Sequence, residues 1–169
     1  MHKSIMAAFC AVFAVGCTTS KSIRTSIEID ATPQRVFDVL SDFSKYPLWN
    51  PYHVRVVGDP VAGAPLEVRV SRPDGRIVDV PHVHVIRAEP GEALYWGGGP
   101  EHIFNGEHRF DLAPLDGGTR TLVHHDEDFS GLFIGFADLP VPVLTEGYEQ
   151  MNEALKAWVE ADMDSDGRE

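Results

Sequence analysis

The chain has 169 residues, of which 43% are hydrophobic, and this is enough for one domain of ordinary size around an apolar core. Its formal net charge is -12, and no run of Lys and Arg occurs anywhere in it. An acidic chain of this kind repels nucleic-acid phosphates and anionic lipid headgroups, so we expect no nucleic-acid partner and no basic membrane-binding patch.

The first sixteen residues are typical of a secretory signal peptide. A short basic start precedes an apolar run from Ile5 to Val15, which is too short to cross a bilayer as a helix. The segment Ala14–Cys17 resembles the lipobox of bacterial lipoproteins. That resemblance implies cleavage before Cys17 and lipid on its thiol, whereas ordinary secretion would use the same cut and leave a free thiol. We expect lipidation of Cys17 and a membrane-anchored lipoprotein of the bacterial cell envelope, facing the periplasm.

The mature chain begins with a polar tether over residues 17–22. Isoleucines on one face predict a strand over 23–29. Thr32 is a fitting N-cap and Pro33 suits a first helical turn, so a helix follows at once. Residues 43–49 are expected to form a second short helix or turn.

A long antiparallel meander comes next, because turn-forming Gly, Pro and Asp residues separate stretches rich in strand formers. The expected strands cover residues 52–58, 65–71, 76–88, 92–98, 103–113 and 119–129. One long helix completes the domain, which spans residues 23–161, and an acidic tail occupies 162–169. In that helix an apolar stripe runs from Leu144 to Val159, and Asn152 is expected on the opposite, polar side. An antiparallel sheet covered by helices on one face is an α+β fold.

Four motifs stand in order along the domain: Ile29-x-Ala31-x-Pro33-x-x-Val36-Phe37, Tyr46-Pro47-x-Trp49-Asn50-Pro51, His108-Arg109-Phe110 and Gly147-Tyr148-x-x-Met151-Asn152. With them the chain resembles the START/Bet v 1 superfamily, and more narrowly the bacterial polyketide cyclase/dehydrase-like (SRPBCC) proteins. The resemblance implies a helix-grip fold, in which a curved antiparallel sheet of about seven strands surrounds the C-terminal helix. It also implies a hydrophobic cavity for a lipid, a polyketide or an aromatic compound.

Strand alternation points to one polar patch inside this cavity. If Phe110 and Phe129 face inward, then His108, His125 and Glu127 face inward with them. A histidine beside a carboxylate in an apolar pocket can act as a general base, and these three residues are the candidate catalytic groups. The alternative is that the same groups only orient a polar end of the ligand or satisfy the core.

The residues expected to contact the ligand come from several elements of the domain. They are Phe37, Trp49, Tyr52, Trp96, His108, Phe110, His125, Glu127, Phe129, Phe133, Met151 and Leu155. The apolar but irregular stretch 129–143 is either a flap at the cavity mouth or a loop tucked under the last helix.

The sequence has no nucleotide-binding glycine motif and no zinc-protease or hydrolase motif, and we expect no cofactor and no metal. His82 and His84 share a strand face, but no third ligand is evident in the spacing. Three functions remain open. The first is a membrane-anchored binding protein for a small hydrophobic or amphipathic ligand, the second is a cyclase, dehydratase or isomerase, and the third is an accessory structural lipoprotein with a filled interior.

Overall fold

The structure is a computed structural model, and it describes residues 19–100 and 102–166. The expected signal peptide and Cys17, the expected site of lipidation, therefore lie outside the described residues. Seven strands, three α-helices and two single-turn 3-10 helices form the described part. In chain order they are β1 (Thr19–Ile29), α1 (Pro33–Ser41), η1 (Phe43–Lys45), α2 (Tyr46–Trp49), β2 (His53–Val57), β3 (Pro65–Ser71), β4 (Ile77–Glu89), β5 (Ala93–Gly98), β6 (Asn105–Leu115), η2 (Asp116–Gly118), β7 (Arg120–Gly131) and α3 (Val141–Asp166).

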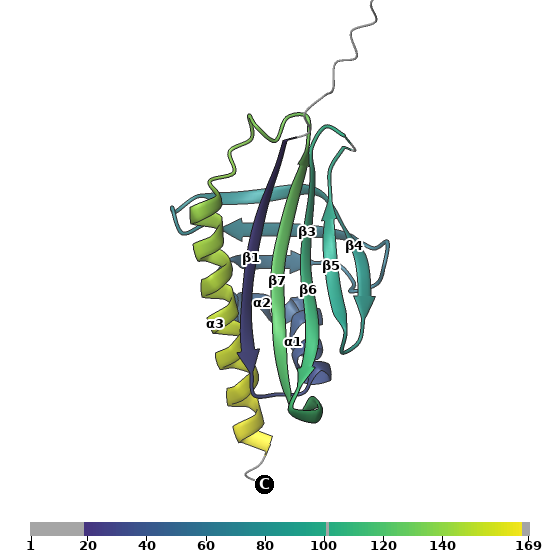
Figure 1. Ribbon diagram of the computed structural model, residues 1–169, viewed down its shortest axis with the longest axis vertical. Helices are drawn as coiled ribbons and strands as arrows, with labels where there is room; N and C mark the ends of the chain where they lie inside the picture. The colour runs from purple at the N-terminus through teal and green to yellow at the C-terminus, as the bar shows by residue number, and fades with distance from the viewer. Residues whose placement is uncertain (1–18, 101, 167–169) are drawn as a thin grey trace, which may run out of the picture.

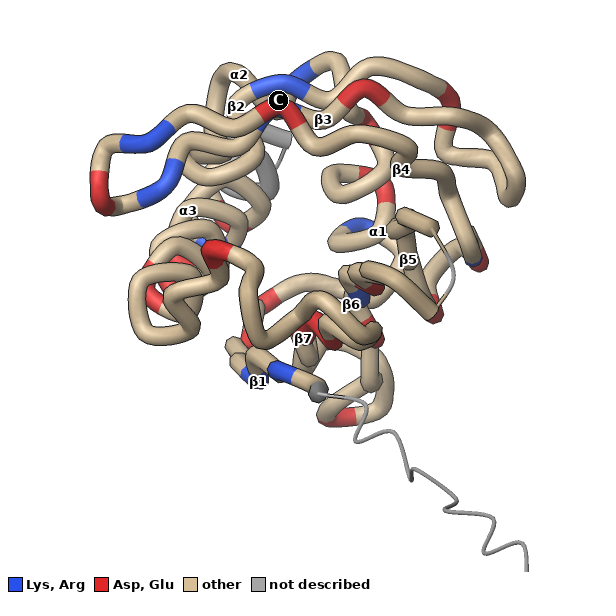
Figure 2. Tube along the Cα trace, turned by 90° about the horizontal axis from the view of Figure 1, so that it is seen from above, with Lys and Arg blue, Asp and Glu red and all other residues tan. Residues whose placement is uncertain are grey.

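All seven strands form one antiparallel sheet in the order β1-β7-β6-β5-β4-β3-β2. Helix α3 lies along the sheet on its concave side and packs against β1, while α1 and α2 cover the lower part of the same side (Figure 1). Seen from above, the strands and α3 form a ring (Figure 2). The expected helix-grip fold is confirmed.

The first helix begins as the sequence predicts. The Thr32 hydroxyl accepts a hydrogen bond from the Arg35 amide at 3.3 Å, and Pro33 occupies the first turn, where its missing N–H costs nothing. Val36 and Leu40 lie four residues apart and are fully buried. This spacing is the reason that α1 presents one apolar face to the interior.

Two elements are longer than expected. Strand β1 starts at Thr19, so most of the expected tether is in fact paired with β7, where the Ser22 hydroxyl donates to the Asp128 carboxylate at 2.6 Å. Backbone pairing needs no apolar side chains, and this is why the polar segment could not be recognised as strand. Helix α3 likewise runs to Asp166, past the expected start of the tail at residue 162.

Strand β4 contains a bulge, which the sequence did not predict. Leu66 pairs with Val83 and Val68 with Val80, so Pro81 and His82 together lie opposite Glu67 alone, and β4 has one extra residue there. Proline donates no hydrogen bond to a ladder, and His82 has a positive φ of 59°, as an irregular strand residue can. A bulge of this kind bends its strand and increases the local twist of the sheet.

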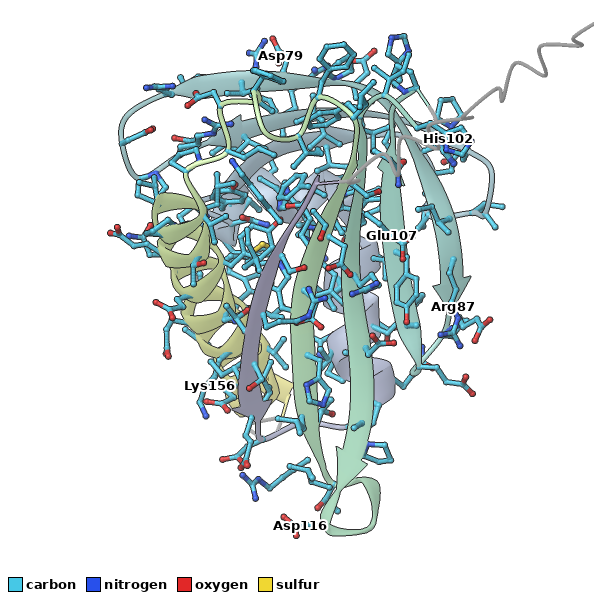
Figure 3. The ribbon with its side chains drawn as sticks, turned by 45° about the horizontal axis from the view of Figure 1, so that its top comes forward. Asp79, Arg87, His102, Glu107, Asp116 and Lys156 are labelled. Carbon is cyan, nitrogen blue, oxygen red and sulfur yellow. The ribbon has the colours of Figure 1, made fainter. Side chains whose placement is uncertain are left out.

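Charged side chains lie on the exterior of the domain (Figure 3). Arg87, Glu107, Asp116 and Lys156 project away from the interior on four different parts of the surface (Figure 3). Among the described residues, no helix has the length and apolar character needed to cross a membrane. The interior holds an apolar core to which the helices and all seven strands contribute.

Candidate functional site

An internal cavity of about 250 Å³ lies between the sheet and the first half of α3. Its walls are mainly apolar and include Val68, Val70, Val83, Trp96, Phe104, Phe129, Leu139 and Leu144. Polar side chains meet at its inner end, which we call the floor; these are Tyr52, His53, His108, Glu127 and Tyr148. A small apolar cavity with a few convergent polar groups is the usual form of a ligand site.

Strand alternation brings the floor together. In the ladder between β6 and β7, His108 is opposite Glu127 and Phe110 is opposite His125. His108, Phe110 and His125 are buried, and Glu127 reaches the cavity. The predicted inward direction of these side chains is confirmed. Gly106 leaves space beside the carboxylate, since an added Cβ would lie 3.4 Å from Glu127 Oε1.

The floor is joined by hydrogen bonds. The Tyr148 hydroxyl contacts Glu127 Oε2 through a short hydrogen bond and His108 Nδ1 at 2.8 Å. On the opposite side of the His108 ring, Nε2 lies 3.1 Å from Nε2 of His125. Four side chains from β6, β7 and α3 therefore form one connected chain.

This chain continues into the core below the cavity. His125 Nδ1 lies 2.7 Å from Asn152 Oδ1, and the Asn152 amide donates to the Thr25 hydroxyl at 3.0 Å. The Thr25 hydroxyl in turn donates to the backbone carbonyl of His125 at 2.7 Å. Every polar atom of this buried end therefore has a partner, as a low-dielectric interior requires.

Stacked rings fix the orientation of both histidines. Trp96 stacks on His108 with ring centroids 4.6 Å apart and planes 13° apart. His125 is sandwiched between Phe110 and Tyr148, each with a centroid distance of 4.3 Å. Neither imidazole can turn without displacing a neighbouring ring, so the hydrogen-bond partners of each nitrogen are fixed.

Burial favours the uncharged form of every group on the floor. It lowers the pKa of His53 and of His125 to about 3, and it also lowers the pKa of His108, where the neighbouring His125 adds to the effect. Burial raises the pKa of Glu127 to about 7, against the hydrogen bond from Tyr148, which lowers it. An acid that is half ionised near neutral pH is suited to proton exchange.

The expected ligand contacts divide into three groups in the structure. Tyr52, Trp96, His108, Glu127 and Phe129 line the cavity. Phe133 is half-exposed on the loop after β7. The rest are buried in the core below or beside the cavity: Phe37, Trp49, Phe110, His125, Met151 and Leu155.

Three polar residues of the floor and of the hydrogen-bonded chain below it were not predicted as site residues from the sequence. Asn152 was expected on the solvent side of α3, but it is only 3% exposed and bonds to His125, so this prediction was wrong. Tyr148 was recognised only as part of the apolar stripe. Its spacing of four residues from Asn152 places both on one helix face, and that was the available signal. His53 follows an Asn-Pro turn and gave no sign of burial.

The mouth of the cavity lies where the chain between β7 and α3 passes over it. Leu132 and Phe136 on this loop are 62% and 88% exposed, whereas Leu139 is buried and lines the cavity. Asp138 ties the loop to the β3–β4 turn through Arg76 and through Arg72, whose Nη1 is 3.2 Å from the carboxylate. Leu139 thus covers the cavity, as expected of a flap, whereas Leu132 and Phe136 face outward and are not tucked under the last helix.

In the part of the chain that the structure describes, no group of three or more His, Cys, Asp or Glu side chains is arranged to hold a metal ion. His82 and His84 are exposed on β4, and only His82 lines the cavity rim.

The comparisons with known proteins agree with this geometry. Residues 20–160 match the family described as polyketide cyclase / dehydrase and lipid transport, and the chain belongs to this family. No curated protein matches the sequence.

Several solved structures share the fold at low sequence identity. The Zhui aromatase/cyclase from a Streptomyces species is 14% identical and has a TM-score of 0.65, with 84% of this chain and 94% of that chain covered. A START superfamily protein from Mycobacterium smegmatis is 21% identical and has a TM-score of 0.60, with 83% and 97% covered. Norcoclaurine synthase from Thalictrum flavum is 16% identical and has a TM-score of 0.62, with 95% and 98% covered.

Proposed function

We propose that this protein is a membrane-anchored binding protein of the bacterial cell envelope, which holds a small hydrophobic or amphipathic ligand in its internal cavity. The observation that carries the proposal is the cavity itself, whose walls are apolar and whose floor is polar. A ligand with an apolar body and one polar end would bury its body against the walls and hydrogen-bond to the floor.

The size of the cavity favours a compact ligand. A volume of about 250 Å³ lies just below the usual range of small-molecule sites, which is about 300–1,000 Å³. An aromatic compound of one or two rings is closer to this size than a lipid with two acyl chains. An interior with this much space also argues against an accessory protein with a filled core.

Membrane attachment would orient the cavity. Thr19 pairs with Gly131, so the chain after Cys17 enters the domain beside the loop that carries Leu132 and Phe136. These exposed apolar side chains would then face the bilayer together with the mouth of the cavity.

Mass spectrometry of the mature N-terminus tests the anchor. We expect lipid on Cys17 in the wild type. In Cys17→Ser we expect no lipid and no membrane attachment. A wild-type N-terminus without lipid would contradict this part of the proposal.

Binding can be measured with 2-naphthol as the probe, because Trp96 is the only one of the three tryptophans that lines the cavity. We expect the probe to change the emission of Trp96 saturably. Gly106→Val should abolish the change, since its added methyl groups enter the cavity beside Glu127 and Phe129. Ala113→Val, on the outer face of the same strand, is the matched control and should bind normally. Equal binding by both variants would mean that the cavity is not the site.

An acid–base enzyme is the second candidate, and the hydrogen-bonded contact of Glu127 with Tyr148 favours it. Of the predicted catalytic groups, His108 and Glu127 reach the cavity, whereas His125 lies behind His108. In an enzyme, Glu127→Gln would remove turnover while affinity for the ligand stayed near that of the wild type.

A further inference from the structure

The direction of the hydrogen bonds below the cavity is fixed at their inner end. The Thr25 hydroxyl has one proton, and a backbone carbonyl can only accept, so this proton is used on the carbonyl of His125. The Asn152 atom that faces Thr25 must then be the amide nitrogen, which donates. Its oxygen therefore faces His125, and His125 Nδ1 must carry a proton.

The same reasoning extends to the cavity. A neutral His125 with its proton on Nδ1 has a bare Nε2, so His108 must donate from its own Nε2. The bare Nδ1 of His108 then accepts the one proton of the Tyr148 hydroxyl. Tyr148 has no further proton for Glu127, and their short contact is satisfied only if the carboxyl group donates. Neutral histidines thus require a protonated Glu127.

A second arrangement satisfies the same contacts with the same number of protons. The proton on Glu127 Oε2 moves to the Tyr148 oxygen while the proton of that hydroxyl moves to His108 Nδ1. Glu127 becomes a carboxylate and His108 an imidazolium, and no atom is gained or lost. A further hop, from His108 Nε2 to His125 Nε2, would place the charge on His125.

We infer that Glu127, Tyr148, His108 and His125 form a proton relay that shares one proton between the floor of the cavity and the core, and whose cavity end binds a hydroxyl group of the ligand. The second half rests on the proposed function. In the first arrangement the carboxyl proton lies on Oε2, toward Tyr148, and in the second Glu127 is a carboxylate, so Oε1 is an acceptor in both. Among the described residues no donor reaches Oε1, which lies beside Gly106. A phenolic or enolic hydroxyl would complete it.

The surroundings decide where the proton rests. The titratable and charged groups around the relay are Tyr52, His53, Arg72, Arg109 and Asp128, in addition to the relay members themselves. The stacked rings of Trp96 and Phe110 bury both imidazoles, which disfavours an imidazolium. The resting position is therefore Glu127, and burial, which raises the pKa of this group to about 7, acts in the same direction. The imidazolium form is the minor one.

Nitrogen NMR of the histidine-labelled, ligand-free protein tests the relay without any ligand. Below the pKa of Glu127 we expect opposite tautomers, with the proton on Nδ1 of His125 and on Nε2 of His108. As the pH rises, loss of the shared proton turns the Tyr148 hydroxyl toward the Glu127 carboxylate, so His108 Nδ1 loses its hydrogen bond and its signal should shift at the midpoint of Glu127. The contact with Asn152 keeps the proton on Nδ1 of His125 throughout. Identical tautomers on the two rings, or no shift of His108 Nδ1 at that midpoint, would overturn the relay.

Three variants make the test specific. In Glu127→Gln the side-chain amide donates to Tyr148 as the protonated acid does, so the opposite tautomers should persist and the pH-dependent step at His108 Nδ1 should vanish. Tyr148→Phe should also remove the step. Tyr52→Phe is the matched control, because its ring contacts Tyr148 at 5.2 Å and no hydrogen bond joins it to the relay; it should keep the step. A step that persists in Glu127→Gln would contradict the proposal.

The ligand half has its own test. The wild-type protein should bind 2-naphthol roughly tenfold more tightly than 2-methoxynaphthalene, which has the same ring system and no hydroxyl proton, as one hydrogen bond to a partly charged acceptor would give. Equal affinity for the two probes would refute the hydroxyl site and leave the relay standing. Failure of both probes to bind would instead count against the cavity as a ligand site and so against the hydroxyl site as well.

Discussion

The interior has two halves that share strands β6 and β7 and helix α3 but are packed differently. The upper half, toward the loops, encloses the cavity and includes Tyr52, Trp96, Gly106, Phe129 and Leu144. The lower half is filled by side chains with almost no exposure, among them Ile29, Leu40, Phe110, Leu155 and Val159. The layer of His108, His125 and Tyr148 separates the two, so the polar chain lies at the boundary between free space and packed core.

Side-chain size accounts for the difference. Where β5 and β6 pass the cavity, Gly98 pairs with Gly106, and Gly97 is next to them. In the lower half the same two strands pair Leu94 with Phe110. Gly106 leaves space beside Glu127 and Phe129 that neighbouring groups do not fill. Gly97 and Gly98 have another role, because a Cβ on either would lie 2.1 Å from a backbone oxygen of a neighbouring strand.

The largest expected effect separates the halves by stability. Leu155→Ala should lower the free energy of unfolding by about 2–5 kcal/mol, since Leu155 is fully buried in the packed half and its loss leaves a new cavity. Leu144→Ala, on the same helix, only enlarges a cavity that already exists, and we expect a smaller cost. Denaturant unfolding of both variants measures this. Equal costs would mean that the upper half is packed as densely as the lower half.

The second effect concerns pH. The raised pKa of Glu127, about 7 against an ordinary 4.5, means that the folded state holds one more proton than the unfolded state between these pH values. Stability from this group is therefore lost as the pH rises through that window, by roughly 3 kcal/mol in total. The buried histidines act in the opposite direction, with stability lost as the pH falls below their ordinary pKa.

The difference between the wild type and Glu127→Gln isolates the carboxyl group, because the variant keeps every histidine. We expect the wild type to lose stability relative to Glu127→Gln as the pH rises from about 4.5 to about 7. Chemical denaturation at several pH values gives this comparison. A difference that is constant with pH would show that Glu127 ionises normally.

The third effect tests the boundary layer. Asn152→Ala removes the acceptor of the His125 Nδ1 proton and leaves that donor buried. An unsatisfied buried donor costs about 1–3 kcal/mol, so the variant should unfold at a lower denaturant concentration by that amount. Gln150→Ala, on the exposed side of the same helix, is the control and should be nearly neutral. A neutral Asn152→Ala would mean that water or another group satisfies His125.

The smallest effect on stability is expected at the mouth. Asp138→Ala removes exposed ion pairs to Arg72 and Arg76, which are worth about 0–1 kcal/mol. Because these pairs tie the loop across the cavity, the variant should exchange 2-naphthol faster while its stability hardly changes. Stopped-flow measurement of Trp96 emission gives the rates. Unchanged rates would show that the ligand enters by another path.

Sequence patterns predicted most strands and helices because these depend on local periodicity, whereas the helix-grip arrangement was expected from the resemblance to the START/Bet v 1 superfamily. The strand alternation that turned His108, His125 and Glu127 inward held over the whole β6–β7 ladder. Asn152 was predicted to be exposed because it is a polar residue at the edge of an apolar stripe. Its hydrogen-bond partners, His125 and Thr25, come from strands that are distant in the sequence, so the helix pattern alone could not indicate its burial. The boundary between cavity and packed core depends on which residues pair across strands, and a single sequence does not carry that register.

Native mass spectrometry of the wild-type protein, extracted gently from its own membranes, tests the central proposal most directly. We predict a complex with one small molecule, held without a covalent bond, in the wild type and in Ala113→Val. Gly106→Val should carry no such molecule, because its side chain occupies the space beside Glu127 Oε1. A wild-type protein that is ligand-free, or a ligand that remains bound in Gly106→Val, would contradict the binding of a ligand in this cavity.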